Sequence, residues 1–555
     1  MKPPINQSLY VLFFVIASLL TLPILAQNAT TTKEWQEDLR FLQNTVNKQY
    51  PFLFKKVSSE TFNAEVDKFH EAIPNMAQHE ILVGFERIVS LFKYGHTRVG
   101  SREGVIDYHK LPVNLYYFKD GVYIEGVHQS HETILGAKLL KIEGVPVEEA
   151  LRLIKPSFPS ENDQWFKTYG TGYLALPEVL HAQGVMKSLK QTITYTVEKD
   201  GKTFDYDLMS FTPESGRTNY GYMKQEGEWL SSRNQEVTPL YLKHLNKMYY
   251  YEYLPEEKAV YVRHSQIQDD PSEDIPTFYA KLFDFIENND VEKLILDVRL
   301  NGGGNNYKNK PIVTGIIKSE KINKPGHLFV IIGRRTFSAC QNLINELDNY
   351  TNVVFVGEPS GENINFYGDN RRVMLPKSKL PVYLSFAWWQ DKPQWENADW
   401  TAPHAPVEMN FAEYSTNQDP VLQKALDFNT EGFVLDPMGH LTDLFLSGQM
   451  ERVKQDAMAM MQDERYAFVD FEDQFNRAAY NMIGSEQNQG AIFILQLTTQ
   501  AYPKSVLSWK NFGDALRYEM NYEQAKACYN KVIELAPDSP EAKSAKKALD
   551  KMEKG

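Results

Sequence analysis

Hydrophobic positions change their spacing along the chain and divide it into four stretches. In the first stretch, apolar residues recur every three or four positions, as at Leu39, Leu42 and Val46. This spacing is typical of amphipathic helices that bury one face, and prolines break it into separate segments. Residues 27–104 are therefore predicted to form an N-terminal helical domain.

The second stretch, residues 105–215, has short runs rich in β-branched and aromatic residues. They cover Val113–Phe118, Val122–Val127 and Thr192–Val197, and one helical stretch, Val147–Ile154, lies among them. Runs of this length and composition predict strands. We expect a compact β-rich module here.

In the third stretch, residues 216–430, continuous apolar runs alternate with helical patterns. The predicted strands are Ala259–Arg263, Lys293–Val298, His327–Ile332 and Val353–Val356, and the predicted helices include Ile275–Glu287 and Ser338–Leu347. Strands that are apolar throughout and separated by helices indicate a sheet covered on both faces. This α/β core is where we expect chemistry.

The tail, residues 440–555, repeats itself. Ala491, Leu495 and Pro503 recur 34 residues later as Ala525, Tyr529 and Pro537. That period is the period of tetratricopeptide repeats. The second copy is clearer, with further packing residues at Trp509, Phe512, Gly513 and Tyr518. Because two copies fall short of the three or so that such arrays need, flanking helices near 445–465 and 540–553 are expected to cap them, or the module to dock on the core.

Composition supports a protein of several folded domains. The chain has 555 residues, more than one hydrophobic core usually supports, and its 42% hydrophobic and 24% charged residues are typical of globular proteins. The formal net charge of -13, spread without long runs of one sign, argues against a nucleic-acid partner. Only Cys340 and Cys528 are present, so neither a disulfide framework nor a cysteine-rich metal site is expected.

Residues 1–26 have the pattern of a signal peptide. Lys2 precedes the apolar run Leu9–Leu25, and Ala26 is a suitable last residue before cleavage, so the mature chain is expected to begin near Gln27. The run is also long enough for an uncleaved membrane anchor, which is the alternative. Either way the rest of the chain is expected outside the cytoplasm, in the periplasm or the extracellular space.

Ser338 is the first candidate for chemistry, because it follows an apolar strand and opens a helix. There its amide and that of Ala339 lie at a helix N-terminus, where developing negative charge is stabilised. A serine needs a base to become a nucleophile, and the resulting oxyanion needs backbone donors. On local sequence alone, a helix cap is the favoured interpretation of Ser338, and only the other segments overturn it.

Gly302, Gly303 and Gly304 follow the strand that ends near Val298. Glycines allow backbone N–H groups to approach a ligand closely, as in an oxyanion hole. A tight turn or a phosphate loop would use the same residues, although no GK[ST] sequence follows.

His96 is the candidate base, within the segment YGHTRVG, although a single histidine is more often structural. The chain has no HExxH sequence and no Cys/His spacing for zinc, and Ser338 lacks a GxSxG context. Zinc hydrolysis and the α/β-hydrolase type of site therefore have no support.

Taken together, three segments resemble the S41 peptidases, the tail-specific or C-terminal processing proteases, and in particular their tricorn-like branch. The segments are YGHTRVG at His96, LILDVRLNGGGNN from Leu294, and RRTFSACQNLINEL at Ser338. The resemblance covers most of residues 35–428. It implies a crotonase-like (ClpP/crotonase) α/β core, and it implies a PDZ-like module because LGAKLLKIEGVPVEEAL, residues 135–151, is similar to the family's PDZ-like segment.

By this resemblance, Ser338 is the nucleophile, His96 the general base, and the amides of Gly303 and Ala339 the oxyanion hole. Asp297, Arg299 and Asn301 would shape the end of the strand. The segment QWENADW matches the glutamate that orients the histidine, so Glu396 takes that role. A solvated surface glutamate is the alternative at Glu396, with Asp399 and Glu362 as competing carboxylates.

Two departures from the family pattern bear on the base. Where the bacterial processing branch has a lysine, in GEPSGENIN, this chain has Asn363, so a Ser-Lys dyad is not expected. Gly95 stands where tricorn has a serine beside its histidine, and Thr97 is a candidate substitute.

The resulting hypothesis is an exported serine peptidase that works through a Ser-His(-Glu) acyl-enzyme on a peptide or protein substrate. No metal or organic cofactor is expected, and the tetratricopeptide module could bind a protein partner. The alternative is an inactive S41-like scaffold that binds peptides or small apolar ligands. A third possibility, in which the repeats carry the main function, is weaker because two repeats offer little concave surface.

Overall fold

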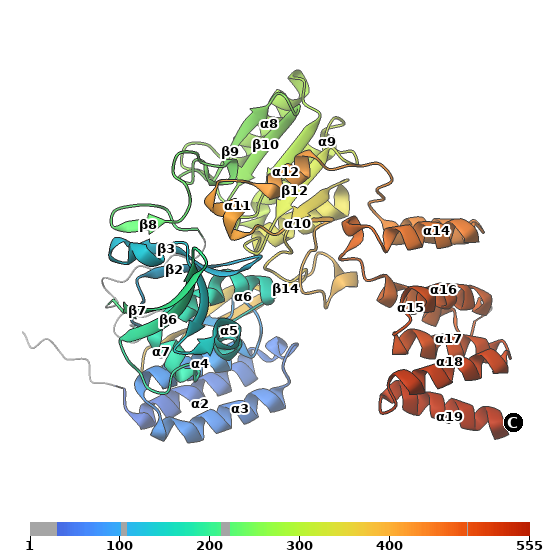
Figure 1. Ribbon diagram of the computed structural model, residues 1–555, viewed down its shortest axis with the longest axis horizontal. Coiled ribbons are helices and arrows are strands. Elements are labelled where there is room, and N and C mark those ends of the chain that lie inside the picture. Colours follow the sequence, from blue (N-terminus) through green and yellow to red (C-terminus); the bar gives the residue numbers. More distant parts are fainter. Residues whose placement is uncertain (1–29, 101–107, 212–221, 486, 555) are drawn as a thin grey trace, which may run out of the picture. The chain divides into compact units, whose positions relative to one another are not determined.

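The computed structural model describes residues 30–100, 108–211, 222–485 and 487–554 (Figure 1). The predicted signal peptide, residues 1–26, lies outside them. The chain forms two compact units, each described here by itself. The first unit takes the described residues within 30–117, 121–232 and 365–390, and the second unit takes those within 118–120, 233–364 and 391–554.

Three helices open the first unit, as the sequence predicts. They are α2 (Thr32–Gln49), α3 (Ser59–Ala72) and α4 (Gln78–Ser90). Thr31 and Glu34 form a capping box at the start of α2, and Ser58 caps α3. The periodic apolar residues are buried, with Leu39 and Val46 fully inaccessible to solvent.

The β-rich module is a sheet of seven strands within the first unit. Five form its main path, β2 (Val113–Phe118), β3 (Gly121–His128), β4 (Lys138–Ile142), β6 (Thr192–Lys199) and β7 (Lys202–Met209), while β5 (Val145–Pro146) pairs with β4 and β8 (Trp229–Ser231) with β3.

Helices of the module only partly match the prediction. Helix α5 (Val147–Ile154) is confirmed with its predicted bounds. The expectation of one helix was wrong, since α6 (Asp163–Tyr169) and α7 (Pro177–Ala182) also form. Each of these two helices is shorter than two full turns, so hydrophobic periodicity does not reveal them.

A small antiparallel sheet joins distant parts of the sequence in the first unit. Strand β15 (Pro381–Trp389) lies between β1 (Arg98–Val99) and β14 (Phe366–Met374). Strands β14 and β15 fall inside the segment 216–430 predicted as α/β core, but they group with the first unit. The segment that forms β14 and β15 therefore belongs to the first unit, although the residues before and after it in sequence belong to the second.

The second unit contains the α/β core. Its sheet has the order β16-β13-β12-β11-β10-β9, parallel from β16 to β10 with β9 antiparallel at the edge. The bounds are β9 (Tyr249–Leu254), β10 (Ala259–His264), β11 (Lys293–Asp297), β12 (Leu328–Ile332), β13 (Val354–Gly357) and β16 (Ala405–Pro406).

Both faces of this sheet are covered, as predicted. Alternate strand residues pack with helices α8 (Ile275–Asn288), α9 (Lys310–Lys318) and α10 (Ala339–Tyr350) on one face. The other face packs against α12 (Pro420–Leu426), which follows the short helix α11 (Phe411–Ser415). The predicted apolar strands are therefore buried on two sides.

Seven helices form the C-terminal part of the second unit. They are α13 (Pro437–Leu446), α14 (Met450–Met460), α15 (Phe471–Met482), α16 (Asn488–Ala501), α17 (Val506–Tyr518), α18 (Tyr522–Leu535) and α19 (Pro540–Lys554). Helix starts repeat at the predicted period, since Asn488 and Tyr522, and likewise Val506 and Pro540, are 34 residues apart.

Packing between these helices uses the residues of the repeat. Gly513 of α17 lies so close to Tyr529 of α18 that an added Cβ would be 2.7 Å from the tyrosine ring. The Tyr529 hydroxyl also donates to Asp514 Oδ1 at 2.7 Å. A small residue facing a large one fixes the spacing of this helix pair.

Cys340 and Cys528 are free and buried. Across the part of the chain that the structure describes, no helix combines the length and the apolar character that a membrane span requires.

Candidate catalytic site

Ser338 has a strained backbone at the junction between β12 and α10. Its φ is 56° and its ψ is -128°, although it is not a glycine. It occupies the N-cap position of α10, but its side chain makes no capping hydrogen bond. The helix-cap interpretation of Ser338 is therefore not supported. Strain of this kind, about 1–3 kcal/mol, persists where the surroundings impose it and is concentrated at functional sites.

Gly303 lies directly against Ser338 within the second unit. An added Cβ at Gly303 would be 2.6 Å from Cβ of Ser338 and 3.0 Å from the amide nitrogen of Ala339. Gly303 also has a φ of +100°. The two amides predicted as the oxyanion hole thus belong to neighbouring pieces of backbone, and only glycine fits at position 303.

The amide of Gly303 already has a partner in this structure. It donates to Oδ1 of Asn301 at 2.9 Å, while Nδ2 of Asn301 donates to the carbonyl of His264 at 2.9 Å. Asn301 is fully buried. It therefore holds the glycine turn in place, and the Gly303 N–H would serve an oxyanion only by sharing or releasing this bond.

Asp297 and Arg299 form a buried ion network at the end of β11. Arg299 donates through Nε to Asp297 at 3.0 Å and through both terminal nitrogens to Asp419 at 2.8 and 3.1 Å. Tyr261 donates to the other oxygen of Asp297 at 2.7 Å. Burial raises the pKa of Asp297 despite the neighbouring guanidinium. These contacts anchor the strand end, and the supporting role of Asp297 and Arg299 in catalysis stays a prediction.

Glu362 contacts the nucleophile candidate, and the sequence suggested it only as a rival orienting carboxylate. Its Oε2 accepts the backbone N–H of Ser338 at 3.1 Å, and its side chain is fully buried. The adjacent Gly361 amide donates to the carbonyl of Thr336 at 3.1 Å. The loop after β13 thus stabilises the strained turn through these two hydrogen bonds, at Thr336 and at Ser338.

A neighbouring thiol does not compete with Ser338. Burial raises the pKa of Cys340, which lies two residues away in the first turn of α10, so the thiol stays protonated and unreactive.

His96 lies in the first unit, in the loop between α4 and β1. Its ring stacks on Phe366 of β14 with centroids 6.1 Å apart, and its carbonyl accepts from Nδ2 of Asn370 at 3.1 Å. Burial and, to a smaller extent, the nearby Arg98 charge lower the pKa of His96 to about 4. The imidazole is therefore neutral at pH 7, the form that accepts a proton.

The residues on both sides of His96 fix the loop. The Gly95 amide donates to Oε2 of the buried Glu161 at 2.6 Å. The Thr97 hydroxyl donates to Oγ of Ser385 at 2.8 Å and accepts the Ser385 amide at 3.1 Å. Thr97 is thus occupied in joining β1 to β15, which weakens its candidacy as a catalytic hydroxyl.

Glu396 and its neighbours lie in the second unit. Glu396 and Asp399 are exposed, just after the short 3-10 turn Pro393–Trp395, whereas Asn363 is buried. His96 belongs to the first unit and Ser338 and Glu396 to the second. Their assembly into one catalytic group stays a prediction.

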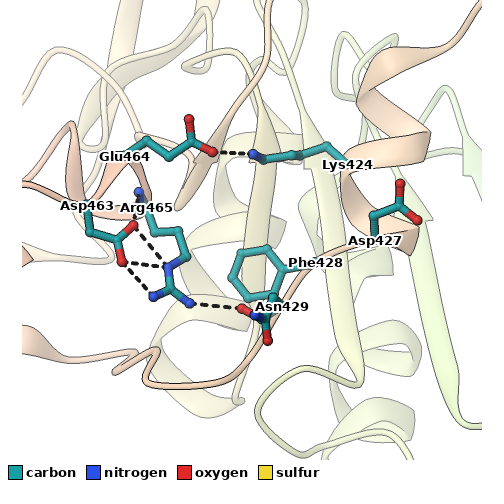
Figure 2. A pocket seen from close by; sticks show the side chains of 7 residues that line it. All are labelled: Lys424, Asp427, Phe428, Asn429, Asp463, Glu464 and Arg465. Carbon is teal, nitrogen blue, oxygen red and sulfur yellow. Dashed lines mark hydrogen bonds and ion pairs between the residues drawn. The ribbon is translucent and has the colours of Figure 1, made fainter.

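A pocket of about 370 Å³ lies elsewhere in the second unit, and none of the predicted site residues lines it (Figure 2). Its charged side chains largely neutralise one another, since Lys424 pairs with Glu464 at 2.5 Å and Arg465 with Asp463 at 2.6 Å. Such a lining leaves little charge to recognise a ligand, so we assign it no role.

No protein-family model matches the chain, and no curated protein matches it. Solved structures to which it is similar include mature CPAF complexed with lactacystin, at 14% identity and a TM-score of 0.47, covering 72% of this chain and 99% of that one. They also include the photosystem II D1 C-terminal processing protease, at 13% identity and a TM-score of 0.33, covering 67% and 93%.

A candidate S41 protease from Bacteroides fragilis is similar at 14% identity with a TM-score of 0.28, covering 60% of this chain and 85% of that one. The family named there is the one that the sequence motifs resemble. The likeness to each of these structures is distant.

Proposed function

We propose that the chain is an exported serine peptidase of the S41 kind, in which Ser338 attacks the carbonyl of a peptide bond. His96 takes the serine proton and returns it to the leaving amine, and water then releases the acyl-enzyme. Glu396 orients His96. The amides of Gly303 and Ala339 stabilise the oxyanion.

The observation that carries this proposal is the backbone of Ser338. A non-glycine residue with φ of 56° begins a helix without capping it, and the glycine turn at Gly303 packs against its Cβ. A structural serine would relax to an ordinary cap. A strained turn that presents the hydroxyl beside two backbone amides is the arrangement that an acyl-transfer nucleophile needs.

His96 supports the proposal independently. Its loop is fixed by Glu161 and Ser385, and its lowered pKa keeps the ring neutral near pH 7. A base must be unprotonated and correctly placed before it can act.

The other domains complete the proposal. In it, the α/β core is crotonase-like, the sheet of the first unit with α5 is a PDZ-like module that recognises the tail of a protein substrate, and helices α15–α19 are tetratricopeptide-type repeats that dock a protein partner. The 34-residue spacing of helix starts and the contact between Gly513 and Tyr529 support the repeats.

A serine-reactive fluorophosphonate tests the nucleophile. The purified mature chain should be labelled, and Ser338→Ala and His96→Ala should both lose labelling. Ser505→Ala is the matched control, because Ser505 caps α17 by accepting the Ser508 amide at 3.0 Å. That variant should lose stability but keep full labelling. Undiminished labelling of Ser338→Ala would refute the proposal, and a folded but unlabelled wild type would favour the binding scaffold.

A further inference from the structure

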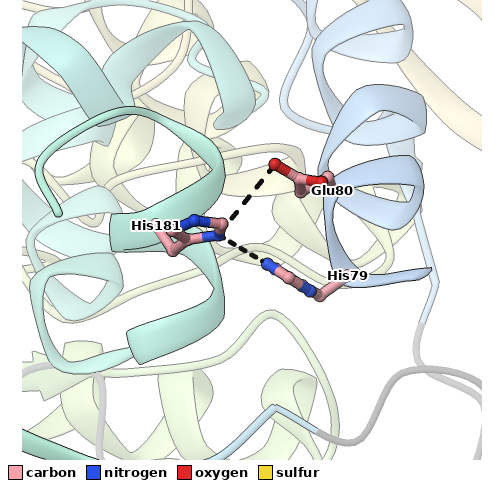
Figure 3. Close-up of side chains that lie close together, drawn as sticks. All are labelled: His79, Glu80 and His181. Carbon is pink, nitrogen blue, oxygen red and sulfur yellow. Dashed lines mark hydrogen bonds and ion pairs between the residues drawn. The ribbon is translucent and has the colours of Figure 1, made fainter. Parts of the chain in front are cut away.

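Two histidines and a glutamate meet between helices α4 and α7 of the first unit (Figure 3). Nε2 of His79 lies 2.8 Å from Nδ1 of His181, and Oε1 of Glu80 lies 4.0 Å from the same Nδ1. The three side chains are half-buried, so an ion from solvent could reach them. The two histidines are 102 residues apart in sequence.

The helices hold these side chains in place before any ligand arrives. Glu80 is the third residue of α4, and its Oε2 accepts the amide of Ala77 at 2.7 Å, which leaves Oε1 facing the histidines. His181 is in the last turn of α7, whose residues Val179 and Leu180 are fully buried. Preorganised ligands lose little entropy on binding.

The charges around the pair favour a cation. The carboxylates of Glu80 and Glu178 both act on His79 and add negative potential there. Two imidazole nitrogens in direct contact must share one proton, and a metal ion can replace it.

We propose that His79, His181 and Glu80 bind a divalent transition-metal ion of the zinc class, with water completing the coordination. Bonds of about 2.0–2.1 Å in tetrahedral geometry place ligand atoms about 3.3 Å apart. The two nitrogens would separate slightly and the Glu80 oxygen would approach, changes that side-chain rotation supplies. Two imidazoles and one carboxylate suit Zn²⁺ and neighbouring metals better than Mg²⁺ or Ca²⁺.

The site has no part in the proposed peptidase mechanism and stands whether or not that mechanism holds. Its effect is to tie α4 to α7, and a ligand that binds only the folded state raises the melting temperature. We therefore expect a stabilising ion rather than a catalytic one.

The test uses the chain purified without a histidine tag and stripped with a chelator. Zn²⁺ should raise its melting temperature by several degrees, Co²⁺ should give the visible absorption of a nitrogen- and oxygen-ligated site, and Mg²⁺ should do neither. His181→Gln and His79→Gln should weaken Zn²⁺ binding at least about tenfold in a calorimetric titration.

Two further variants make the result specific. Glu80→Gln keeps an oxygen for the Ala77 amide but loses the charged ligand, so binding should weaken without loss of the helix cap. His70→Gln, a histidine of α3 outside the cluster, should bind Zn²⁺ like the wild type. Two results would overturn the proposal. One is a wild-type melting temperature that does not change with Zn²⁺, and the other is wild-type Zn²⁺ affinity in both His181→Gln and Glu80→Gln.

Discussion

At the scale of single residues, the backbone strain at Ser338 predicts that a glycine there is more stable than an alanine. Glycine adopts φ of 56° without a Cβ penalty, whereas alanine keeps the penalty. Ser338→Gly should therefore be more stable than Ser338→Ala by about 1 kcal/mol, after the entropy cost of glycine. Denaturant unfolding of the two variants measures the difference.

Both variants should lose fluorophosphonate labelling, because both lack the hydroxyl. The comparison separates strain from chemistry, because the two variants differ in backbone strain but lack the same hydroxyl. If Ser338→Gly were the less stable variant, the turn would not be strained in solution.

Gly303 and Gly302 offer a matched pair for the glycine turn. A Cβ at Gly303 would meet Ser338, and its φ of +100° disfavours any side chain, whereas a Cβ at Gly302 would have nothing within 4 Å. Gly303→Ala should lower the free energy of unfolding by at least about 2 kcal/mol and abolish labelling. Gly302→Ala should remain close to the wild type in both measurements. Equal behaviour of the two variants would contradict the close packing at Ser338.

The lowered pKa of His96 predicts how the labelling rate depends on pH. Burial brings this pKa to about 4, and Arg98 contributes a smaller decrease. A base works only when unprotonated, so the rate should hold from neutral pH down to about 5 and reach half of its neutral value near pH 4. Arg98→Gln removes the positive charge and should move this fall to higher pH. A midpoint at or above 6.5 in the wild type would show that another group is the base.

The free energy of unfolding should also depend on pH, in the range between the unfolded and folded pKa values of the buried histidines. The folded state keeps His96 and the fully buried His264 neutral, since the pKa of each is lowered to about 4. The unfolded chain takes up these protons below about pH 6.5. The stability tied to these two groups is therefore complete above pH 6.5 and falls as the pH decreases toward 4.

At the scale of elements, Glu362 links the loop after β13 to the start of α10. Loss of its carboxylate would take from the partly buried Ser338 amide its present acceptor, at a cost of about 1 kcal/mol. Glu362→Ala should therefore slow labelling markedly, while Glu362→Gln, which keeps an acceptor oxygen, should recover most of the rate. A full rate in Glu362→Ala would mean that the turn does not depend on this loop.

The elements that the sequence predicts best are those with strong periodicity. Helix α5 has its predicted bounds, and the four predicted strands of the α/β core agree to within one residue at each end. Strands β14 and β15 were missed as a separate sheet because their pairing with β1 joins residues that are far apart in sequence. Local patterns carry no information about such pairing.

The candidate site was predictable only in part for the same reason. The segments around Ser338 and Gly303 show their chemistry locally, through a glycine run and a strand-to-helix junction. The hydrogen bond from Ser338 to Glu362 and the cluster of His79 with His181 depend on tertiary structure, across 24 and 102 residues. No spacing rule for catalytic or metal sites covers such distances.

At the scale of the whole molecule, the C-terminal helices either contribute to the proposed activity or only accompany the α/β core. The α/β sheet keeps both of its layers without them, because α12 and Phe428 cover the second face. Their link to the core includes Tyr466, whose ring stacks on Phe433 and whose hydroxyl accepts the Val434 amide at 2.8 Å. The core therefore has the parts to fold alone.

A chain that ends at residue 436 should accordingly be labelled at nearly the rate of the full chain and melt a few degrees lower, because the contacts of Phe433 are lost. Tyr466→Phe is the matched control, since it removes only the hydroxyl that accepts the Val434 amide and should lower the melting temperature less than the truncation does. If the truncated chain folds, as its circular dichroism would show, but is not labelled, the helices contribute to the site itself. Retained labelling with slower cleavage of protein than of short peptides would instead assign them to substrate or partner binding.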